Sequence, residues 1–252
     1  MIDIYVICLD KMKKTRGIPT LKTLNHLNHK KYNIIPFKAI TPEDFNINSD
    51  IIHPAIKTNI KDNHTIHSDL LYKNNHVACA LSHIELWKKC VITNKPIIIS
   101  EDDNILSRKK INKIMSHLDN IPEDTDIFCL RNMAFGVKYY SKKRYINKLK
   151  HFNGLQLYYI TPKCCKKLLK HVFPLIYHVD SYISHCIPSM NLNVYSSKDS
   201  HIPQLIYIKD FMKSTLSHDV LNSDNYVNNL QKMIYVIIII IMIIFICLCK
   251  LV

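Results

Sequence analysis

The strongest constraint in this sequence is a short β-branched run that ends in three acidic residues. The run KPIIIS occupies residues 95–100, and Glu101, Asp102 and Asp103 follow it directly. Consecutive β-branched residues indicate a strand that is buried on both faces. Before it, residues 76–93 place apolar side chains at helical spacing. A helix that leads into a buried strand favours an α/β fold.

The rest of the chain alternates in the same way between strand and helix patterns. The 252 residues suit one large α/β domain better than two small ones. Residues 41–75 are polar and lack a sustained period, which predicts a long loop. The alternation predicts a mainly parallel sheet in a single domain, residues 1–211. The expected strands are residues 2–9, 33–40, 95–100, 125–132, 191–197 and 204–211, and the expected helices are residues 20–32, 76–93, 107–118 and 161–173.

The C-terminal run MIYVIIIIIMIIFICLC, residues 233–249, has no charged residue. Its length lies near the lower limit for crossing the hydrocarbon core of a bilayer. Lys232 and Lys250 stand at its two ends, where snorkelling amines would lie. A buried helix is the alternative. We expect a transmembrane tail anchor at residues 232–250, joined to the domain by a polar linker, residues 212–231.

The cysteines and the N-terminus indicate the compartment. The nine cysteines are scattered, and the adjacent pair Cys164 and Cys165 cannot readily satisfy disulfide geometry. The apolar run at the N-terminus is too short for a signal sequence, and its lysines follow the run instead of preceding it. We therefore expect reduced thiols and a domain on the cytosolic side of the membrane.

The chain is strongly basic, with 34 Lys and Arg against 20 Asp and Glu and a formal net charge of +14. Such a charge permits binding to nucleic acid, anionic lipid or sulfated polysaccharide, although codon bias in an AT-rich genome is an alternative source of lysine. No nucleic-acid-binding motif is found, which argues against nucleic acid. Two basic clusters are either solvated surfaces or glycosaminoglycan-binding sites: Lys142, Lys143 and Arg144, and Lys163, Lys166, Lys167 and Lys170.

The acidic cluster has a predicted geometry of its own. In an extended segment, Glu101 and Asp103 lie on one side and Asp102 on the other. Two carboxylates on one side can hold Mn²⁺ or Mg²⁺, which in turn can bridge a diphosphate. The alternative is a turn or a helix N-terminus, where acidic residues are also favoured.

The helix at residues 76–93 carries a second set of candidate ligands. His76, Cys79 and His83 fall on one helical face and could bind zinc. The favoured alternative is packing, with His83 satisfied by a local hydrogen bond. Trp87 is expected in the core, because it is in register with the apolar residues of the same helix.

The segment ACALSHIELWKKCVITNKPIIISEDDNIL resembles the core of glycosyltransferase family 25, in which an "SH..lW" helix and a strand precede "EDD". Weaker similarities extend the match over most of residues 2–187. They are IYVICLD with Arg16, FKAIT, GLQLYYITPKCCKKLL, and YHVDSYIS with Asp180.

This resemblance implies a GT-A, Rossmann-like nucleotide-sugar fold with a UDP-sugar donor and a glycan or protein acceptor. It implies that Glu101 and Asp103 hold the metal and diphosphate. It places Asp180 as the general base or as a residue that positions the sugar. Four further residues would lie at or beneath the donor: Arg16, Ser82, His83 and Asp102.

The chain departs from the family pattern near the expected donor pocket. Cys8 stands where the family usually has Asn, Asn75 and His76 where it often has Gly-Glu, and Thr41 and Pro42 where it usually has Asp-Gly. These departures bear on turnover more than on the fold.

A second resemblance is to a poxvirus branch of envelope proteins, which combine a glycosyltransferase-like domain with a C-terminal membrane tail. It rests on SHIELW, IIISEDDNI, DIFCLRN with Arg131, and LYYITPKCCKKLL. Proteins of this branch bind heparan sulfate at the surface of the virion. The resemblance implies an alternative function, in which the same fold on a virion membrane binds host glycosaminoglycans without turnover.

Overall fold

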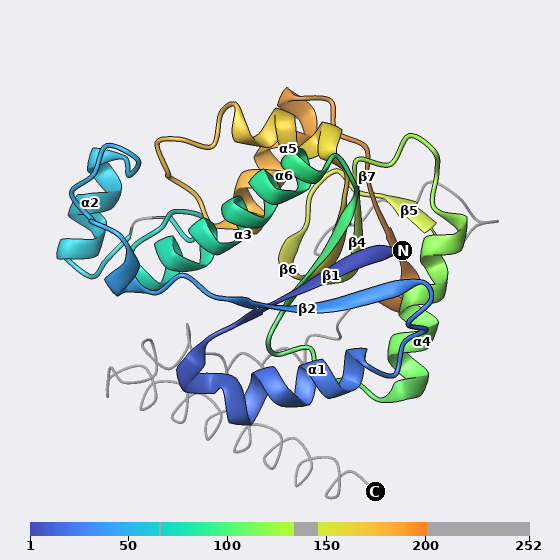
Figure 1. The fold of residues 1–252 in the computed structure, drawn as a ribbon. Coiled ribbons are helices and arrows are strands. Elements are labelled where there is room, and N and C mark those ends of the chain that lie inside the picture. Colours follow the sequence, from blue (N-terminus) through green and yellow to red (C-terminus); the bar gives the residue numbers. More distant parts are fainter. Residues whose placement is uncertain (66, 134–145, 201–252) are drawn as a thin grey trace, which may run out of the picture. The chain divides into compact units, whose positions relative to one another are not determined.

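The computed structural model describes residues 1–65, 67–133 and 146–200. These residues form a seven-stranded sheet in the order β2-β1-β3-β6-β4-β7-β5, with helices on both faces (Figure 1). The strands are β1 (Ile2–Cys8), β2 (Tyr32–Lys38), β3 (Ile97–Glu101), β4 (Ile127–Met133), β5 (Ile146–Lys148), β6 (Asn153–Ile160) and β7 (Val194–Ser197). The α-helices are α1 (Ile18–Leu24), α2 (Pro54–Lys61), α3 (Asn74–Thr93), α4 (Arg108–Ser116), α5 (Pro162–Leu169) and α6 (Val179–Ser189). Shorter helical turns are η1 (Asp10–Met12), η2 (Lys13–Gly17), η3 (Pro42–Asp44), η4 (His117–Asn120) and η5 (Lys198–Ser200).

The sheet confirms an α/β architecture but is only partly parallel. β1 pairs in parallel with both β2 and β3. Beyond β3, β6 is antiparallel to β3 and β4, β7 is parallel to β4, and β5 is antiparallel to β7. The prediction of a mainly parallel sheet is therefore wrong for this half. Parallel neighbours need a crossover connection, usually a helix, and the described residues between β4 and β6 contain none.

Alternating side chains of the central strands divide the core into two layers. Tyr5 and Ile99 belong to the cluster that includes α3, α5 and α6, whereas Ile4 and Ile98 belong to the cluster that includes α1 and α4. Figure 1 shows α3 and α1 on opposite sides of the sheet. Both faces of β1 and β3 are therefore buried, as their β-branched runs predict.

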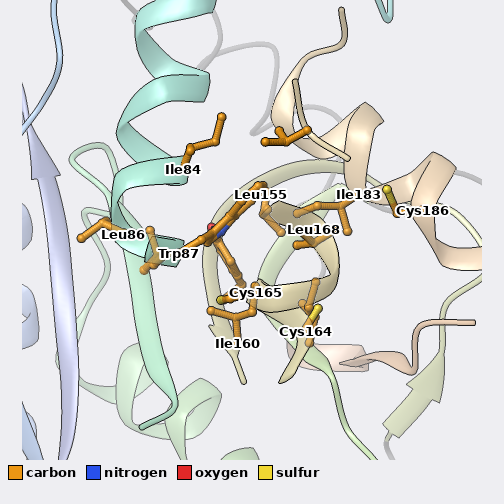
Figure 2. Close-up of a cluster of buried hydrophobic side chains, with 14 of the residues drawn as sticks. Ile84, Leu86, Trp87, Leu155, Ile160, Cys164, Cys165, Leu168, Ile183 and Cys186 are labelled. Atoms are coloured by element: carbon orange, nitrogen blue, oxygen red, sulfur yellow. The ribbon is translucent and has the colours of Figure 1, made fainter. Parts of the chain in front are cut away.

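α3 is the longest described helix and confirms the predicted helix at residues 76–93. It ends where Asn94 adopts a left-handed conformation with φ of 49°, a common way to end a helix. Trp87 is fully buried, as expected. Figure 2 shows its ring among side chains of β6 and α5, including Leu155, Cys165 and Leu168. α3 therefore packs against both the sheet and the helices of the C-terminal half.

Residues 41–75 are not one long loop. Thr41 and Asp44 form a capping box at η3, and α2 begins at Pro54 with the side chain of His53 accepting the Ala55 N–H. Proline is tolerated in the first turn of a helix, because the N–H it lacks would have no partner there. The fully buried Ile56 anchors this helix, so the prediction of one long loop is wrong for these residues.

The other predicted helices and strands are largely confirmed. α4 begins after Ser107, whose side chain accepts the Lys110 N–H, and α5 begins after Thr161, whose side chain accepts the Cys164 N–H. The first predicted helix is shorter than expected and ends at Leu24. The predicted strand at residues 204–211 lies outside the described residues.

Within the described ranges, no helix has both the length and the apolar character needed to cross a membrane. The predicted tail anchor at residues 232–250 and its linker lie outside those ranges, so they stay predictions. The cysteines in the described ranges are free thiols.

Candidate functional site

The candidate site lies where β1 and β3 end side by side. From β1 the chain goes to β2 on one side, and β3 then returns to the other side of β1. This change of direction is a topological switch point, and open α/β sheets bind ligands in the crevice outside the carboxyl ends of such strands. Ile7 is in register with Glu101, so the loop after β1 and the acidic cluster after β3 meet at this edge.

An ion pair joins the two loops. Arg16, carried by η2, lies with a guanidinium nitrogen 2.6 Å from a carboxylate oxygen of Asp102 and 3.5 Å from one of Asp103. Asp102 also accepts the Leu9 N–H at 3.3 Å, and its backbone carbonyl accepts the Thr20 hydroxyl at 2.7 Å. Burial raises the pKa of Asp102, while the charge of Arg16 opposes that shift. Asp102 is thus a buried anchor for the loop after β1.

Glu101 faces a different set of groups. Its carboxylate lies 3.7 Å from Nε2 of His83, and 30% of its side chain is exposed. Desolvation raises the pKa of Glu101 to about 7, with the charge of Arg16 opposing the shift and those of Asp102 and Asp180 adding to it. Glu101 is therefore easier to protonate than an ordinary glutamate and is open to a ligand from one side.

A buried hydrogen-bonded chain lies beneath Glu101. Nδ1 of His83 is 2.9 Å from the hydroxyl of Tyr158 on β6, which also accepts the indole N–H of Trp87 at 2.9 Å. Burial lowers the pKa of His83 to about 4, so the ring is neutral at pH 7. This confirms that His83 is hydrogen-bonded in the core, although its partner comes from a distant strand and not from a local residue.

Ser82 connects the same helix to the end of β2. Its hydroxyl accepts the Ile40 N–H at 2.9 Å and donates to the Ala78 carbonyl at 2.9 Å. Ser82 is buried and holds the backbone after β2 against α3. These contacts are those of a residue that supports the site from beneath.

Asp180 lies in the first turn of α6, on the mixed half of the sheet. Its two carboxylate oxygens accept the Gly154 N–H at 2.7 Å and the Ser181 N–H at 2.9 Å. Gly154 has a φ of 70°, a conformation that residues with a Cβ rarely adopt. The charge of Asp180 acts on both Glu101 and His83. Tertiary structure thus brings Asp180 into the electrostatic neighbourhood of the acidic cluster.

Asn104 and Arg131 belong to the site, although the sequence did not predict a role there for either of them. The side-chain amide of Asn104 donates to the Ser100 hydroxyl at 3.1 Å and to the Glu101 carbonyl at 3.2 Å. Its amide oxygen accepts from the buried Arg131 at 2.9 Å. Asn104 follows EDD directly, and this position is the sequence signal that could have pointed to it. No local pattern predicts Arg131 as its partner.

One group in the described ranges combines several possible metal ligands. The ligand atoms of Cys79, His83 and Glu101 all lie within 4.8 Å of one another. His76 is elsewhere, with its ring against those of Tyr72 and His178. The trio that sequence spacing placed on one helical face is thus separated, and Glu101 from β3 takes the place of His76.

The basic residues divide between described and undescribed parts of the chain. Lys142, Lys143 and Arg144 lie outside the described residues. On α5, Lys163, Lys166 and Lys170 are exposed. Lys167 instead donates to the Met190 carbonyl at 3.2 Å and lies 3.9 Å from Asp126. The exposed face of α5 therefore carries three of the four predicted cationic side chains.

A helix-covered sheet with clustered charged side chains at its switch point is the arrangement found in α/β proteins that bind ligands at the carboxyl edge of parallel strands. The model of glycosyltransferase family 25 (LPS biosynthesis protein) matches residues 1–183, and the chain belongs to this family. In general terms the protein is thus a glycosyltransferase. A comparison with curated proteins finds no match for the chain.

Proposed function

We propose that the protein transfers a hexose from a UDP-sugar to a hydroxyl of a glycan or protein. The observation that carries this proposal is the pairing of Arg16 with Asp102 and Asp103 at the switch point between β1 and β3. The carboxylate of Glu101, with 30% of its side chain exposed, lies close enough for the charges of Arg16 and Asp102 to act on it. A cationic side chain and carboxylates gathered at one strand edge suit a diphosphate with its divalent counterion.

The metal in this proposal is Mn²⁺ or Mg²⁺, held by Glu101 and Asp103. Carboxylate oxygens are the donors that these ions prefer, and the exposure of Glu101 leaves it accessible, so the residues fit the ion. When bound, such an ion neutralises charge on the departing nucleoside diphosphate. Arg16 adds a second positive charge, and the buried Asp102 holds the guanidinium in position.

The acceptor side of the reaction is assigned to Asp180. In the transfer step the acceptor oxygen bonds to the anomeric carbon, the bond from that carbon to the diphosphate breaks, and the acceptor proton must go to a base. The backbone donors on both oxygens of Asp180 fix the orientation of its carboxylate. Each oxygen keeps a lone pair that can accept the acceptor hydroxyl.

Calorimetry with the full-length protein in mild detergent tests the donor site. UDP and UDP-hexoses are titrated with and without Mn²⁺ into wild type, Glu101→Gln and Asp103→Asn. Glu85→Gln is the matched control, because 44% of the Glu85 side chain is exposed on α3 and its carboxylate is paired with Lys88 of the same helix. We expect Mn²⁺-dependent binding in wild type and in the control, and at least about tenfold weaker binding in the two site variants.

Equal binding in all four proteins would refute the donor site. A parallel assay measures UDP release with acceptor glycans, in wild type and Asp180→Asn. Donor binding that persists in Asp180→Asn while transfer is lost supports an acceptor-side role for this residue. Transfer at the wild-type rate contradicts that role.

Membrane attachment through residues 232–250 is part of the proposal. It is supported by the uncharged run of residues 233–249. The N-terminal domain then faces the cytosol, or the outside if the membrane is that of a virion. Alkaline extraction followed by protease digestion of intact membranes tests this: the protein should stay in the membrane and the domain should be digested from the cytosolic side.

A second candidate function is attachment to host heparan sulfate. It is supported by the exposed lysines of α5, which point away from the buried Cys164, Cys165 and Leu168 of the same helix. Clustered amines attract sulfate groups, and salt weakens the attraction. Retention on immobilised heparin that ends well below physiological salt would count against this function.

A further inference from the structure

The buried ring of His83 has one nitrogen with no hydrogen-bond partner. Its side chain is only 1% exposed, and Nδ1 is satisfied by Tyr158, whereas Nε2 has no partner within hydrogen-bonding distance. Buried polar atoms are nearly always paired, so an orphaned ring nitrogen requires an explanation. The carboxylate of Glu101 and the thiol of Cys79 both lie within 4.8 Å of a ligand atom of this ring.

The spacing of these atoms suits a shared metal ion better than a hydrogen bond. Nε2 of His83 and the carboxylate oxygen of Glu101 are 3.7 Å apart, which is too long for a hydrogen bond. Two ligand atoms of a tetrahedral zinc ion are separated by about 3.4 to 3.6 Å, given the usual bond lengths from zinc to nitrogen, oxygen and sulfur. Small side-chain shifts would therefore close the group around an ion.

The surroundings of His83 have the features of a supported metal ligand. Metal-binding histidines usually donate their second ring N–H to an oxygen, which fixes the orientation of the ring. Nδ1 of His83 faces the Tyr158 hydroxyl, which the indole N–H of Trp87 holds in place. With the proton on Nδ1, the lone pair of Nε2 points toward Glu101 and Cys79.

The local charges also favour a cation. The carboxylates of Glu101, Asp103 and Asp180 all act on Cys79 electrostatically, so negative charge surrounds this thiol. A divalent cation would offset that charge and would hold the sulfur as a thiolate. The thiol and imidazole make the site softer than one made of carboxylates alone.

We infer that Cys79, His83 and Glu101 bind Zn²⁺ through Sγ, Nε2 and a carboxylate oxygen. Three protein ligands would leave a fourth position for water or another ligand, and 30% of the Glu101 side chain is exposed to solvent. The site does not depend on the proposed transfer reaction. Glu101 would be shared with the proposed Mn²⁺ or Mg²⁺ site, whereas Cys79 and His83 would serve the zinc site alone.

Metal content is the direct test. The full-length protein is purified in mild detergent without chelator, and its zinc is measured by mass spectrometry. We expect about one zinc per chain in wild type and at least a tenfold lower retention in Cys79→Ser after mild dialysis. Replacement with Co²⁺ should give the absorption band of a cobalt–thiolate bond, and Cys79→Ser should lack it.

Two matched variants separate this site from other effects. Cys186→Ser removes another buried thiol and should retain both zinc and the cobalt band. Asp103→Asn should retain zinc while losing Mn²⁺-dependent UDP binding, so failure of the donor site and failure of the zinc site are distinguishable. Wild-type protein that takes up neither zinc nor cobalt would overturn the inference, as would a thiolate band that persists in Cys79→Ser.

Discussion

The two halves of the sheet contribute different kinds of residue to the candidate site. In the parallel half, β2, β1 and β3 end at the same edge and bring Arg16 and the acidic cluster together. In the mixed half, β6 supplies Tyr158, which pairs with His83 beneath the site, and the start of α6 supplies Asp180, whose charge acts on Glu101. Parallel strands concentrate loops at one edge, whereas antiparallel strands place supporting side chains along their length.

The site is therefore not contained in one supersecondary unit. The charged residues come from loops after β1 and β3, but the buried side chains that pair with their neighbours come from β4 and β6. Substitutions where the halves meet should therefore change mainly stability, whereas substitutions of the charged residues in the parallel half should change ligand binding as well as stability.

Trp87→Ala breaks the contact between the halves and should have the largest effect. The ring is fully buried, and its removal also leaves the Tyr158 hydroxyl without one donor. We expect a loss of about 4 kcal/mol in the free energy of unfolding. Urea unfolding followed by circular dichroism measures it. Ile92→Ala is the control, because Ile92 lies on the same helix with 82% of its surface exposed, and an equal loss there would contradict the role of Trp87.

Arg16→Met should act on the parallel half alone. It leaves the buried carboxylate of Asp102 without its cationic partner, which should cost about 3 kcal/mol of stability. UDP binding by calorimetry should weaken with it. The double variant Arg16→Met with Asp102→Asn should recover part of the stability, because no buried charge is then uncompensated. Strictly additive losses would argue that the ion pair is not coupled.

Acid should weaken the junction of α3 with α6 through His76. Burial lowers the pKa of His76 to about 3, with the charges of His178 and Lys73 adding to the shift. Below pH 6.5, His76 therefore binds a proton in the unfolded chain but stays neutral in the folded chain. The contribution of His76 to stability is fully present above pH 6.5 and is lost as the pH falls toward 3. The expected loss between pH 6.5 and 5 is about 2 kcal/mol.

The measurement is the urea midpoint at both pH values, followed by the fluorescence of Trp87, the single tryptophan of the chain. His76→Gln should show a smaller drop between the two pH values. His151→Gln, a change at an exposed position, should behave as wild type does. Identical pH dependence in all three proteins would rule out His76 as the source.

Neutralising the exposed lysines of α5 should have the smallest effect on stability. Lys163, Lys166 and Lys170 are solvated, so their combined replacement with Gln should change stability by less than about 0.5 kcal/mol. Retention on heparin should fall if this face binds sulfate groups. Unchanged retention would remove α5 from the proposed attachment surface and confine any binding to other basic residues.

Several elements could be predicted because their signals are local. Helical spacing located α3 within two residues at its start, and Thr161 with Pro162 marked the start of α5. The β-branched run located β3. α2 was missed, because its short polar segment shows no sustained apolar period and begins with proline.

The site could be predicted only in part. The carboxylates after β3 and the contribution of Arg16 were expected, the latter by resemblance, and the structure joins them. Asn104 and Tyr158 were not expected in the site. Asn104 pairs with Arg131, 27 positions away, and Tyr158 pairs with His83, 75 positions away, and no local pattern predicts such pairings.

The sequence by itself determined the alternation of strands and helices, the acidic cluster at a strand end and the membership in glycosyltransferase family 25. Each of these depends on neighbouring residues or on a motif read in order along the chain. The antiparallel insertion of β6, the burial of Asp102 against Arg16, and the proximity of Cys79, His83 and Glu101 are set only when the chain packs in three dimensions. These features depend on which strands become neighbours, and that choice is made by packing the whole core.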